Sequence, residues 1–135
     1  MAKTLRLQIV TPEAPFYSED VEMVTMPGVE GQFGVYPDHI RLMTVMVPGE
    51  LIVRKGGRDD FLAVGGGLIE VAADRVDIVT DMAVAAENID EAKVEEARAR
   101  AAARLSEKIS AEEVASVNAA LARSLAQLKV KRRRR

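Results

Sequence analysis

Glycine and proline interrupt the N-terminal part of the chain so often that only short strands fit between them. Between these breaks apolar residues recur at every second position, as in Leu5, Leu7 and Ile9, and this alternation is typical of a strand with one buried face. Gly56-Gly57 indicates a two-residue hairpin turn, because such turns need backbone angles that glycine adopts freely. About ten short strands joined in this way predict a β-sandwich or barrel.

Two stretches of this part need interpretation. The residues from Phe16 to Met26 are mixed, and we interpret them as two short strands around Ser18 to Asp20. Three glycines, Gly65 to Gly67, stand before a strand pair that turns at Ala73-Asp74. A phosphate-binding loop would run directly into a helix, whereas Leu68 to Val71 is a strand pattern, so we expect a bulge or a close approach between strands.

The periodicity changes near Ala86 from alternation to helical spacing. Asp90 is a suitable N-cap for a helix from Glu91 to about Leu105. Ser110 and Glu113 form a capping box that begins a second helix. The expected apolar stripe of this second helix consists of Val114, Val117, Leu121, Leu125 and Leu128.

The sequence therefore predicts a β-sandwich or barrel in residues 1–86 and an antiparallel α-helical hairpin in residues 87–135. Alanine fills the packing side of both helices, and its methyl group buries far less apolar area than a leucine side chain does. Two arrangements fit this composition. The hairpin is either fixed in one place, or held weakly enough to leave the sandwich.

Charge is distributed unevenly along the chain. Lys129, Lys131 and Arg132 to Arg135 are basic, and residues 1–128 hold 13 basic residues against 21 acidic ones. A basic tip on an acidic body suggests an acidic partner for the tip. The body lacks the basic face expected of a nucleic-acid-binding domain.

The residue types exclude several kinds of site. The chain has no cysteine, so disulfides, thiol nucleophiles and zinc-thiolate sites are impossible. His39 is its one histidine, which leaves no histidine pair for a metal. We expect no catalytic residues and no metal site. The N-terminus has no apolar signal core, so we do not expect secretion. No apolar run is long enough to span a membrane.

The stretch from Gly31 to Pro48 predicts a strand, a polar corner and a second strand. Pro37 stops the first strand, because proline cannot donate to a sheet ladder. The corner presents Asp38, His39 and Arg41.

This stretch carries a family resemblance. GxxGVYPDHxxLM followed by PG resembles the ε subunit of the rotary F-type ATP synthase, as do LAVGGGLIEV (62–71), NIDEAKVEEARARAAARL (88–105) and the first strand with its turn. The resemblance implies a non-catalytic rotor subunit of the central stalk, which couples the c-ring and the γ subunit to ATP synthesis. It also implies that the helical arm inhibits ATP hydrolysis, which favours a mobile arm.

The resemblance implies two sets of contacts. The ring contacts are Glu30, Gly31, Gln32 and His39, while Asp38 and Arg41 beside them differ from the commoner family residues. In the extended state the arm reaches the catalytic head of α and β subunits. The basic residues implied for that contact are Arg123, Lys129, Lys131 and Arg132.

Some bacterial members of this family bind ATP in the folded arm through a motif of the form I/L-D-x-x-R-A. Ile89 and Asp90 match it, and Arg100 lies near a second family arginine. Lys93 replaces the first arginine and offers a point charge instead of a planar fork. The resemblance therefore implies weak ATP binding or none.

Two hypotheses follow for the whole chain. As a family member, it would be peripheral on the cytoplasmic side of a bacterial plasma (inner) membrane, with a thylakoid membrane as the second choice. The alternative is a free-standing β-sandwich interaction module whose basic tail binds an acidic polymer, in a manner that salt weakens.

Overall fold

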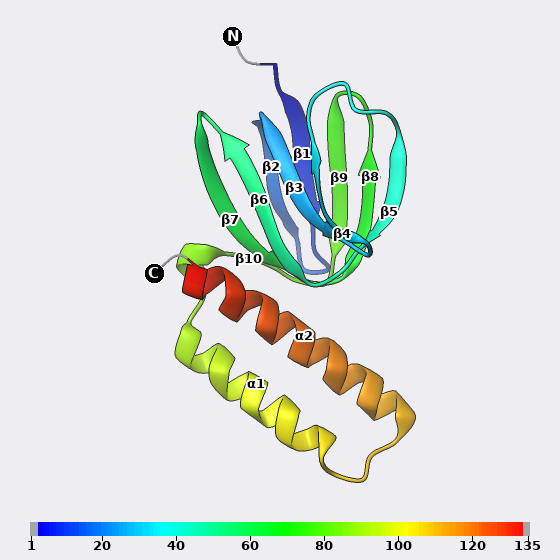
Figure 1. Cartoon of the computed structure of the whole chain (residues 1–135), viewed down its shortest axis with the longest axis vertical. Helices are drawn as coiled ribbons and strands as arrows, with labels where there is room; N and C mark the ends of the chain where they lie inside the picture. Colours follow the sequence, from blue (N-terminus) through cyan, green and yellow to red (C-terminus); the bar gives the residue numbers. More distant parts are fainter. Residues whose placement is uncertain (1–2, 134–135) are drawn as a thin grey trace.

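The computed structural model describes residues 3–133, which form a ten-stranded sheet and two long helices (Figure 1). The predicted fold class, a β-sandwich or barrel followed by a helical hairpin, is confirmed. The strands are β1 (Leu5–Val10), β2 (Pro15–Val21), β3 (Met23–Gly28), β4 (Gly31–Val35), β5 (Leu42–Met46), β6 (Gly49–Lys55), β7 (Arg58–Val64), β8 (Gly67–Val71), β9 (Arg75–Thr80) and β10 (Ala83–Ala85). The helical segments are the 3₁₀ turn η1 (Ala86–Asn88), α1 (Glu91–Leu105) and α2 (Ala111–Arg133).

The strands form one continuous path in the order β10-β7-β6-β3-β5-β8-β9-β1-β2, and β4 pairs with β3 outside this path. The pair of β1 and β9 is parallel, whereas the other pairs are antiparallel. β3 pairs with β6 through Met23–Thr25 and with β5 at Gly28. Because β3 changes partner within six residues, the sheet folds over on itself there and encloses a core.

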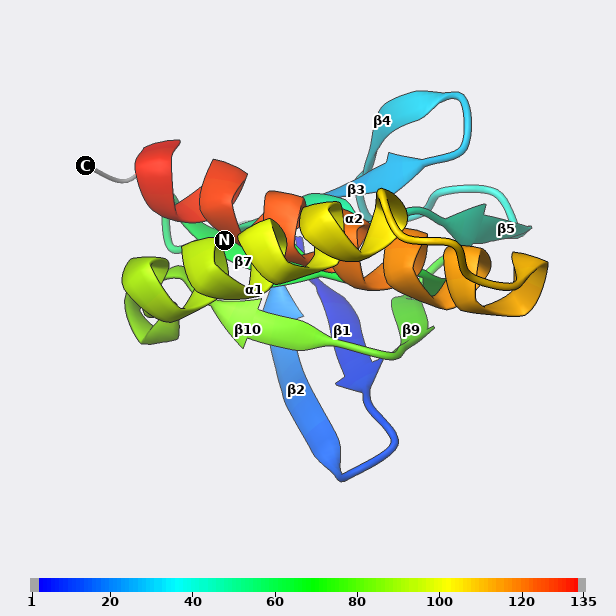
Figure 2. The same cartoon turned by 90° about the horizontal axis from the view of Figure 1, so that it is seen from below.

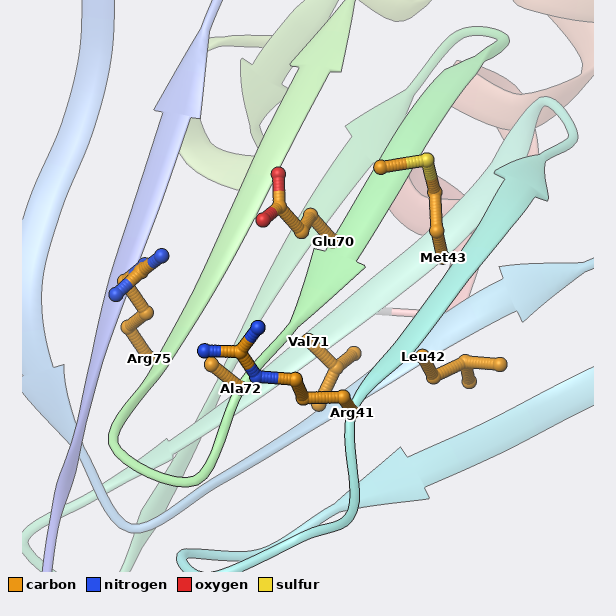
Figure 3. A pocket seen from close by; sticks show the side chains of 7 residues that line it. All are labelled: Arg41, Leu42, Met43, Glu70, Val71, Ala72 and Arg75. Atoms are coloured by element: carbon orange, nitrogen blue, oxygen red, sulfur yellow. The ribbon is translucent and has the colours of Figure 1, made fainter.

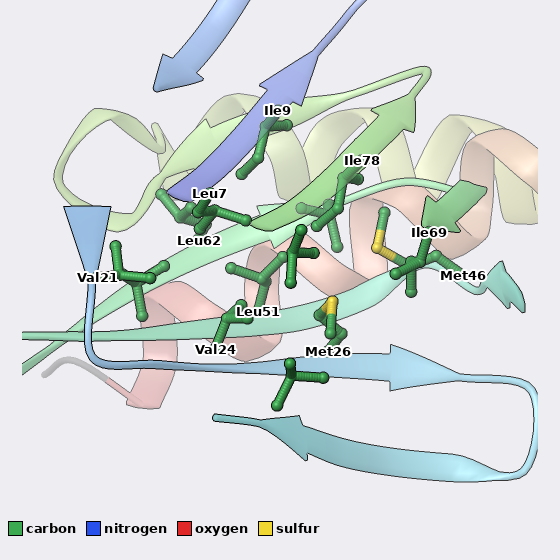
Figure 4. Packing of buried hydrophobic residues seen from close by; sticks show 14 of the residues in the cluster. Leu7, Ile9, Val21, Val24, Met26, Met46, Leu51, Leu62, Ile69 and Ile78 are labelled. Carbon is green, nitrogen blue, oxygen red and sulfur yellow. The ribbon is translucent and has the colours of Figure 1, made fainter. Parts of the chain in front are cut away.

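Alternate side chains of the strands fill this core (Figure 4). In β1 the side chains of Leu5, Leu7 and Ile9 are buried, and those between them are exposed, as the alternation predicts. Full burial of such a side chain stabilises the fold by about 1.5–3 kcal/mol. The core of the sandwich is therefore its main source of stability.

The predicted division of residues 16–26 is wrong in its position. β2 continues through Ser18 to Asp20, and the chain bends at Glu22 instead. The backbone N–H of Glu22 donates to the Arg54 carbonyl at 2.8 Å. At this point the chain leaves its pairing with β1, as β2, and begins its pairing with β6, as β3. The polar residues do not break β2 because its outward side chains pair across the strands, as Arg6 does with Asp20 at 3.3 Å.

Two glycine interpretations are confirmed. Gly56 and Gly57 have φ angles of +60° and +77°, as a tight hairpin turn between β6 and β7 requires. At Gly67 an added Cβ would lie 1.9 Å from the Val79 carbonyl oxygen. Gly67 therefore marks a close approach between the start of β8 and the end of β9.

Both helices begin at their predicted caps. The Asp90 side chain accepts from the Lys93 backbone N–H at 3.2 Å, and Ser110 Oγ accepts from the Glu113 N–H at 3.1 Å. α2 lies between α1 and the sandwich (Figure 1), and Figure 2 shows both helices running across one end of the sandwich.

The predicted stripe of α2 is only partly correct. Leu128 is buried, whereas Leu125 is 49% exposed. A second face of α2 meets the sandwich, where Val130 packs in a cluster with Ala63 of β7. The helix therefore needs two opposite buried faces instead of one broad stripe.

Candidate functional site

The polar corner between β4 and β5 is held by the neighbouring β8–β9 turn. Asp38 has a φ angle of +70°, and its backbone N–H donates to the Ala73 carbonyl at 2.7 Å. Its carboxylate pairs with Lys3. His39 Nδ1 lies 2.7 Å from the Ile40 carbonyl oxygen, so Nδ1 donates and Nε2 remains available to a partner. The corner is thus a fixed, accessible polar loop.

A hollow of about 260 Å³ lies beside this corner. Figure 3 shows Arg41 and Arg75 entering it from either side of β8, with Glu70 on the strand between them. Arg75 Nε donates to Asp77 at 3.0 Å. Arg41 has no ion pair within residues 3–133, so its guanidinium is the group that an acidic partner would meet.

The predicted ring-contact residues do not gather at one point. Glu30 lies in the turn before β4, Gly31 and Gln32 begin that strand, and His39 follows it. The two ends of a five-residue strand lie roughly 13 Å apart. A hollow of about 490 Å³ extends from the turn to Leu42 and Thr44 of β5, and this hollow connects the turn with the strand that follows the corner.

An exposed apolar row crosses the outer face of the sandwich. The strand register places Val45 beside Leu68, Leu68 beside Val79, and Val79 beside Val10. These side chains are 49%, 55%, 58% and 41% exposed, in that order. Contiguous apolar surface of this kind marks an interaction site. We call these four residues the apolar row.

The apolar row was not predicted from the sequence. The available signal was that β5, β8 and β9 carry apolar residues on both faces, as in LMTVM, instead of alternating with polar ones. The row itself depends on the register between four strands, which the sequence did not supply.

Three of the four basic residues predicted for the catalytic head have partners within the chain. Arg123 lies 3.4 Å from Asp81, and Arg132 lies 3.0 Å from Glu95 of α1. Lys131 Nζ donates to the Ala86 carbonyl at 3.4 Å. Lys129 is exposed and has no ion pair among the described residues. Of the basic tail, residues 134 and 135 lie outside the described part.

Salt bridges also connect the two helices to each other. Hydrogen bonds to Glu95 from Arg98, and then from Arg132, lower the pKa of Glu95. Its ionised form is therefore favoured in the folded arm. The resulting stabilisation is present above the pKa of a glutamate in the unfolded chain, and it is lost as the pH falls through the folded-state pKa.

The structure does not bring the predicted ATP-binding residues together. Ile89 is 4% exposed and packs in the cluster between the arm and the sandwich. Asp90 caps α1, as described above. Arg100 is exposed on α1, and ten helical residues span about 15 Å along the axis.

Within residues 3–133, no three His, Asp or Glu residues are grouped so that they could hold a metal ion. The helices there are too short or too polar to cross a membrane.

Comparison with known proteins gives these surfaces a context. Residues 4–86 match the beta-sandwich domain of ATP synthase delta/epsilon chains, and residues 87–132 match the long alpha-helix domain of the same chains. The chain belongs to the ATP synthase delta/epsilon chain family. With both domains present in the family order, it has the architecture of the epsilon subunit of an F-type ATP synthase.

Curated members of the delta/epsilon family resemble the chain over almost its whole length. The ATP synthase epsilon chain of Herpetosiphon aurantiacus is 41% identical over 97% of this chain and 96% of that protein. The epsilon chain of Dehalococcoides mccartyi is 42% identical over 100% of this chain and 96% of that protein.

Solved structures of the family agree with the fold. A chain in the Euglena gracilis mitochondrial ATP synthase structure, which contains OSCP, F1 and the c-ring, is 28% identical with a TM-score of 0.79. That match covers 93% of this chain and 79% of the other. A chain in the Tetrahymena thermophila mitochondrial structure of the central stalk and c-ring is 15% identical, with a TM-score of 0.60 and coverage of 97% and 99%. At that identity it supports the fold alone.

Proposed function

We propose that the chain is a non-catalytic central-stalk subunit of a rotary ATP synthase, and that it couples the γ subunit and the c-ring to ATP synthesis. The observation that carries this proposal is the match to both delta/epsilon domains, in order, across nearly the whole chain. The likeness to a chain in a structure of F1 with the c-ring supports it. In this role residues 1–86 are the rotor-binding part and residues 87–135 are the arm.

We assign the apolar row to the γ subunit. The row lies on a regular sheet face, and a flat apolar surface is suited to a permanent rather than a transient contact. The neighbouring Met43 is 69% exposed and extends the same face. A stable attachment is what a rotor subunit needs, because torque passes through it at every turn.

The polar loops are assigned to the c-ring. Glu30, Gly31 and Gln32 would form one part of this contact and His39 another, so the ring would meet the sandwich along β4 and not at a single loop. In the hollow beside the second part, Arg41 would supply a guanidinium that has no ion pair among the described residues.

We further propose that the arm regulates ATP hydrolysis by extending into the head of α and β subunits. Arg123, Lys129, Lys131 and Arg132 would then meet acidic residues of the head. Three of these four residues have partners within the folded chain. Extension would therefore replace contacts within the chain by contacts with the head. Weak ATP binding near Ile89, Asp90 and Arg100 would shift the equilibrium between the folded and the extended arm.

As part of such a complex, the chain would lie on the cytoplasmic side of a bacterial plasma membrane. The curated relatives named above are bacterial. Attachment would come through its partners in the complex.

The ATPase activity of a matching αβγ head tests the proposal. The head is assayed alone, with the full chain, and with a version that ends at Ala86, while binding to γ is measured by co-purification. We expect both versions to bind γ and only the full chain to inhibit hydrolysis. Binding by both without inhibition would refute the regulatory role, and absence of binding by either would refute the central-stalk assignment.

A further inference from the structure

Glu50 of β6 is the most completely buried acidic side chain that the structure describes. The residue is 1% exposed, and it lies where α2 crosses β6 and β7. Its Oε1 accepts a hydrogen bond from Arg133 Nη1 of α2. Its Oε2 is enclosed and has no hydrogen-bond partner among the described residues. Among the described residues, Arg133 alone therefore compensates this carboxylate.

Arg133 makes a second contact at the same place. Its guanidinium carbon lies 5.4 Å from the centre of the Phe61 ring. A guanidinium group is planar, so it can bond to a carboxylate along its edge while its face covers an aromatic ring. An ammonium group has no such face. The pair of Glu50 and Phe61 therefore selects guanidinium by shape as well as by charge.

We propose that Glu50 and Phe61 form a guanidinium-binding site on the sandwich, and that Arg133 occupies this site and so keeps the arm docked. We call the pair the guanidinium site.

The physical reason is the cost of an uncompensated charge. With the arm docked and Arg133 removed, Glu50 would be a buried carboxylate without a counter-ion, which is strongly unfavourable. Movement of the arm away from β6 would return the carboxylate to water. Loss of the guanidinium therefore favours undocking.

The other described ion pair between α2 and the sandwich is weaker. Arg123 and Asp81 form a partly exposed pair at 3.4 Å, with side chains 34% and 52% exposed. Exposed pairs of this kind contribute little. The apolar contact is a small cluster in which Val130 and Leu128 are the members from α2. Of the two described ion pairs that join α2 to the sandwich, only Glu50–Arg133 has a fully buried partner, the carboxylate, while the Arg133 side chain is 51% exposed. Loss of this pair therefore shifts the arm toward the undocked state.

The distance between two spin labels measures this position. The chain has no native cysteine, so Arg58→Cys on β7 and Asn118→Cys on α2 allow specific labelling of the full-length chain. Both positions are exposed. We compare Arg133→Ala with Lys129→Ala, because each removes one positive charge from the end of α2 and only Arg133 reaches Glu50.

We expect Arg133→Ala to raise the ratio of undocked to docked chains at least tenfold, and Lys129→Ala to leave that ratio within twofold of the parent. Circular dichroism checks that the sandwich remains folded. Equal distance distributions for the two variants would overturn the proposal.

Chemical rescue tests whether the site binds guanidinium as such. Ethylguanidinium, added to Arg133→Ala, should restore the docked distance, whereas ethylammonium at equal ionic strength should not. In the double variant Glu50→Gln with Arg133→Ala, ethylguanidinium should have no effect. Equal responses to the two cations, or rescue without Glu50, would show that the contact is not a guanidinium site.

Discussion

Two neighbouring glycines before and at the start of β8 differ in what a methyl group would meet. At Gly67 an added Cβ would lie 1.9 Å from the Val79 carbonyl oxygen and 2.9 Å from the Thr80 Cα atom. At Gly66 the nearest atom would be the Met46 carbonyl oxygen at 3.6 Å, which is an ordinary contact. The obstruction at Gly67 consists of backbone, which cannot turn aside as a flexible side chain can.

We therefore predict that Gly67→Ala destabilises the sandwich by about 3 kcal/mol, at the upper end of the usual cost of overpacking. Gly66→Ala should change the free energy of unfolding by no more than about 1 kcal/mol, in either direction. Urea unfolding of both variants measures the difference. Similar midpoints for the two would contradict the close approach of β8 and β9.

Among the elements, α2 is the helix with packing partners on two sides, α1 on one and the sandwich on the other. Leu128 belongs to the buried cluster at 2% exposure, and Leu125, three residues earlier, is 49% exposed. Both are leucines of one helix, so their intrinsic helix propensities are the same. Only their packing differs.

Leu128→Ala should destabilise the docked arm by about 2–4 kcal/mol, as deletion of a buried leucine side chain does. Leu125→Ala should cost less than about 1 kcal/mol. Hydrogen exchange of the α1 and α2 amides gives the local stability in each variant. An equal increase in exchange would mean that the stripe predicted from sequence, which included Leu125, describes the arm better.

The sequence predicted those elements whose pattern has a local cause. The alternation in β1, the glycines of the β6–β7 turn and the cap at Asp90 each act within a few residues, and the structure confirms them. The sequence did not predict features that depend on a partner residue far away in the chain. The second buried face of α2 depends on strands far away in the chain, and Glu50 and Arg133 are 83 residues apart.

The same distinction holds for the interaction surfaces. The corner with Asp38 and His39 was predicted because Pro37 and its flanking strands define it locally. The apolar row was not predicted, because four strands contribute one residue each. No contiguous segment contains the row, so only the sheet register reveals it.

For the whole molecule, the apolar row predicts how the sandwich attaches to a partner. Leu68→Glu should weaken binding to γ at least a hundredfold, because a charge would be buried in an apolar contact without a counter-ion. Since Leu68 is 55% exposed, the isolated chain should keep its stability within about 0.5 kcal/mol.

Leu125→Glu is the matched control, because Leu125 is 49% exposed but lies on the arm. It should leave the affinity of the sandwich for γ within about twofold. Affinity is measured by titration of purified γ with each chain, and thermal unfolding checks the fold. Undiminished binding by Leu68→Glu would remove the apolar row from the interface.

The parallel pairing of β1 with β9 also decides when the sandwich can form during synthesis of the chain. β1 needs β9 as its neighbour, with Arg6 beside Arg75. A ribosome adds about 5–20 residues per second, so roughly 3 to 14 seconds separate the synthesis of these two positions. During that interval Leu7 and Ile9 lack the neighbours that later bury them. The nascent chain is therefore most prone to aggregation before the sandwich closes, and the arm can dock only afterwards.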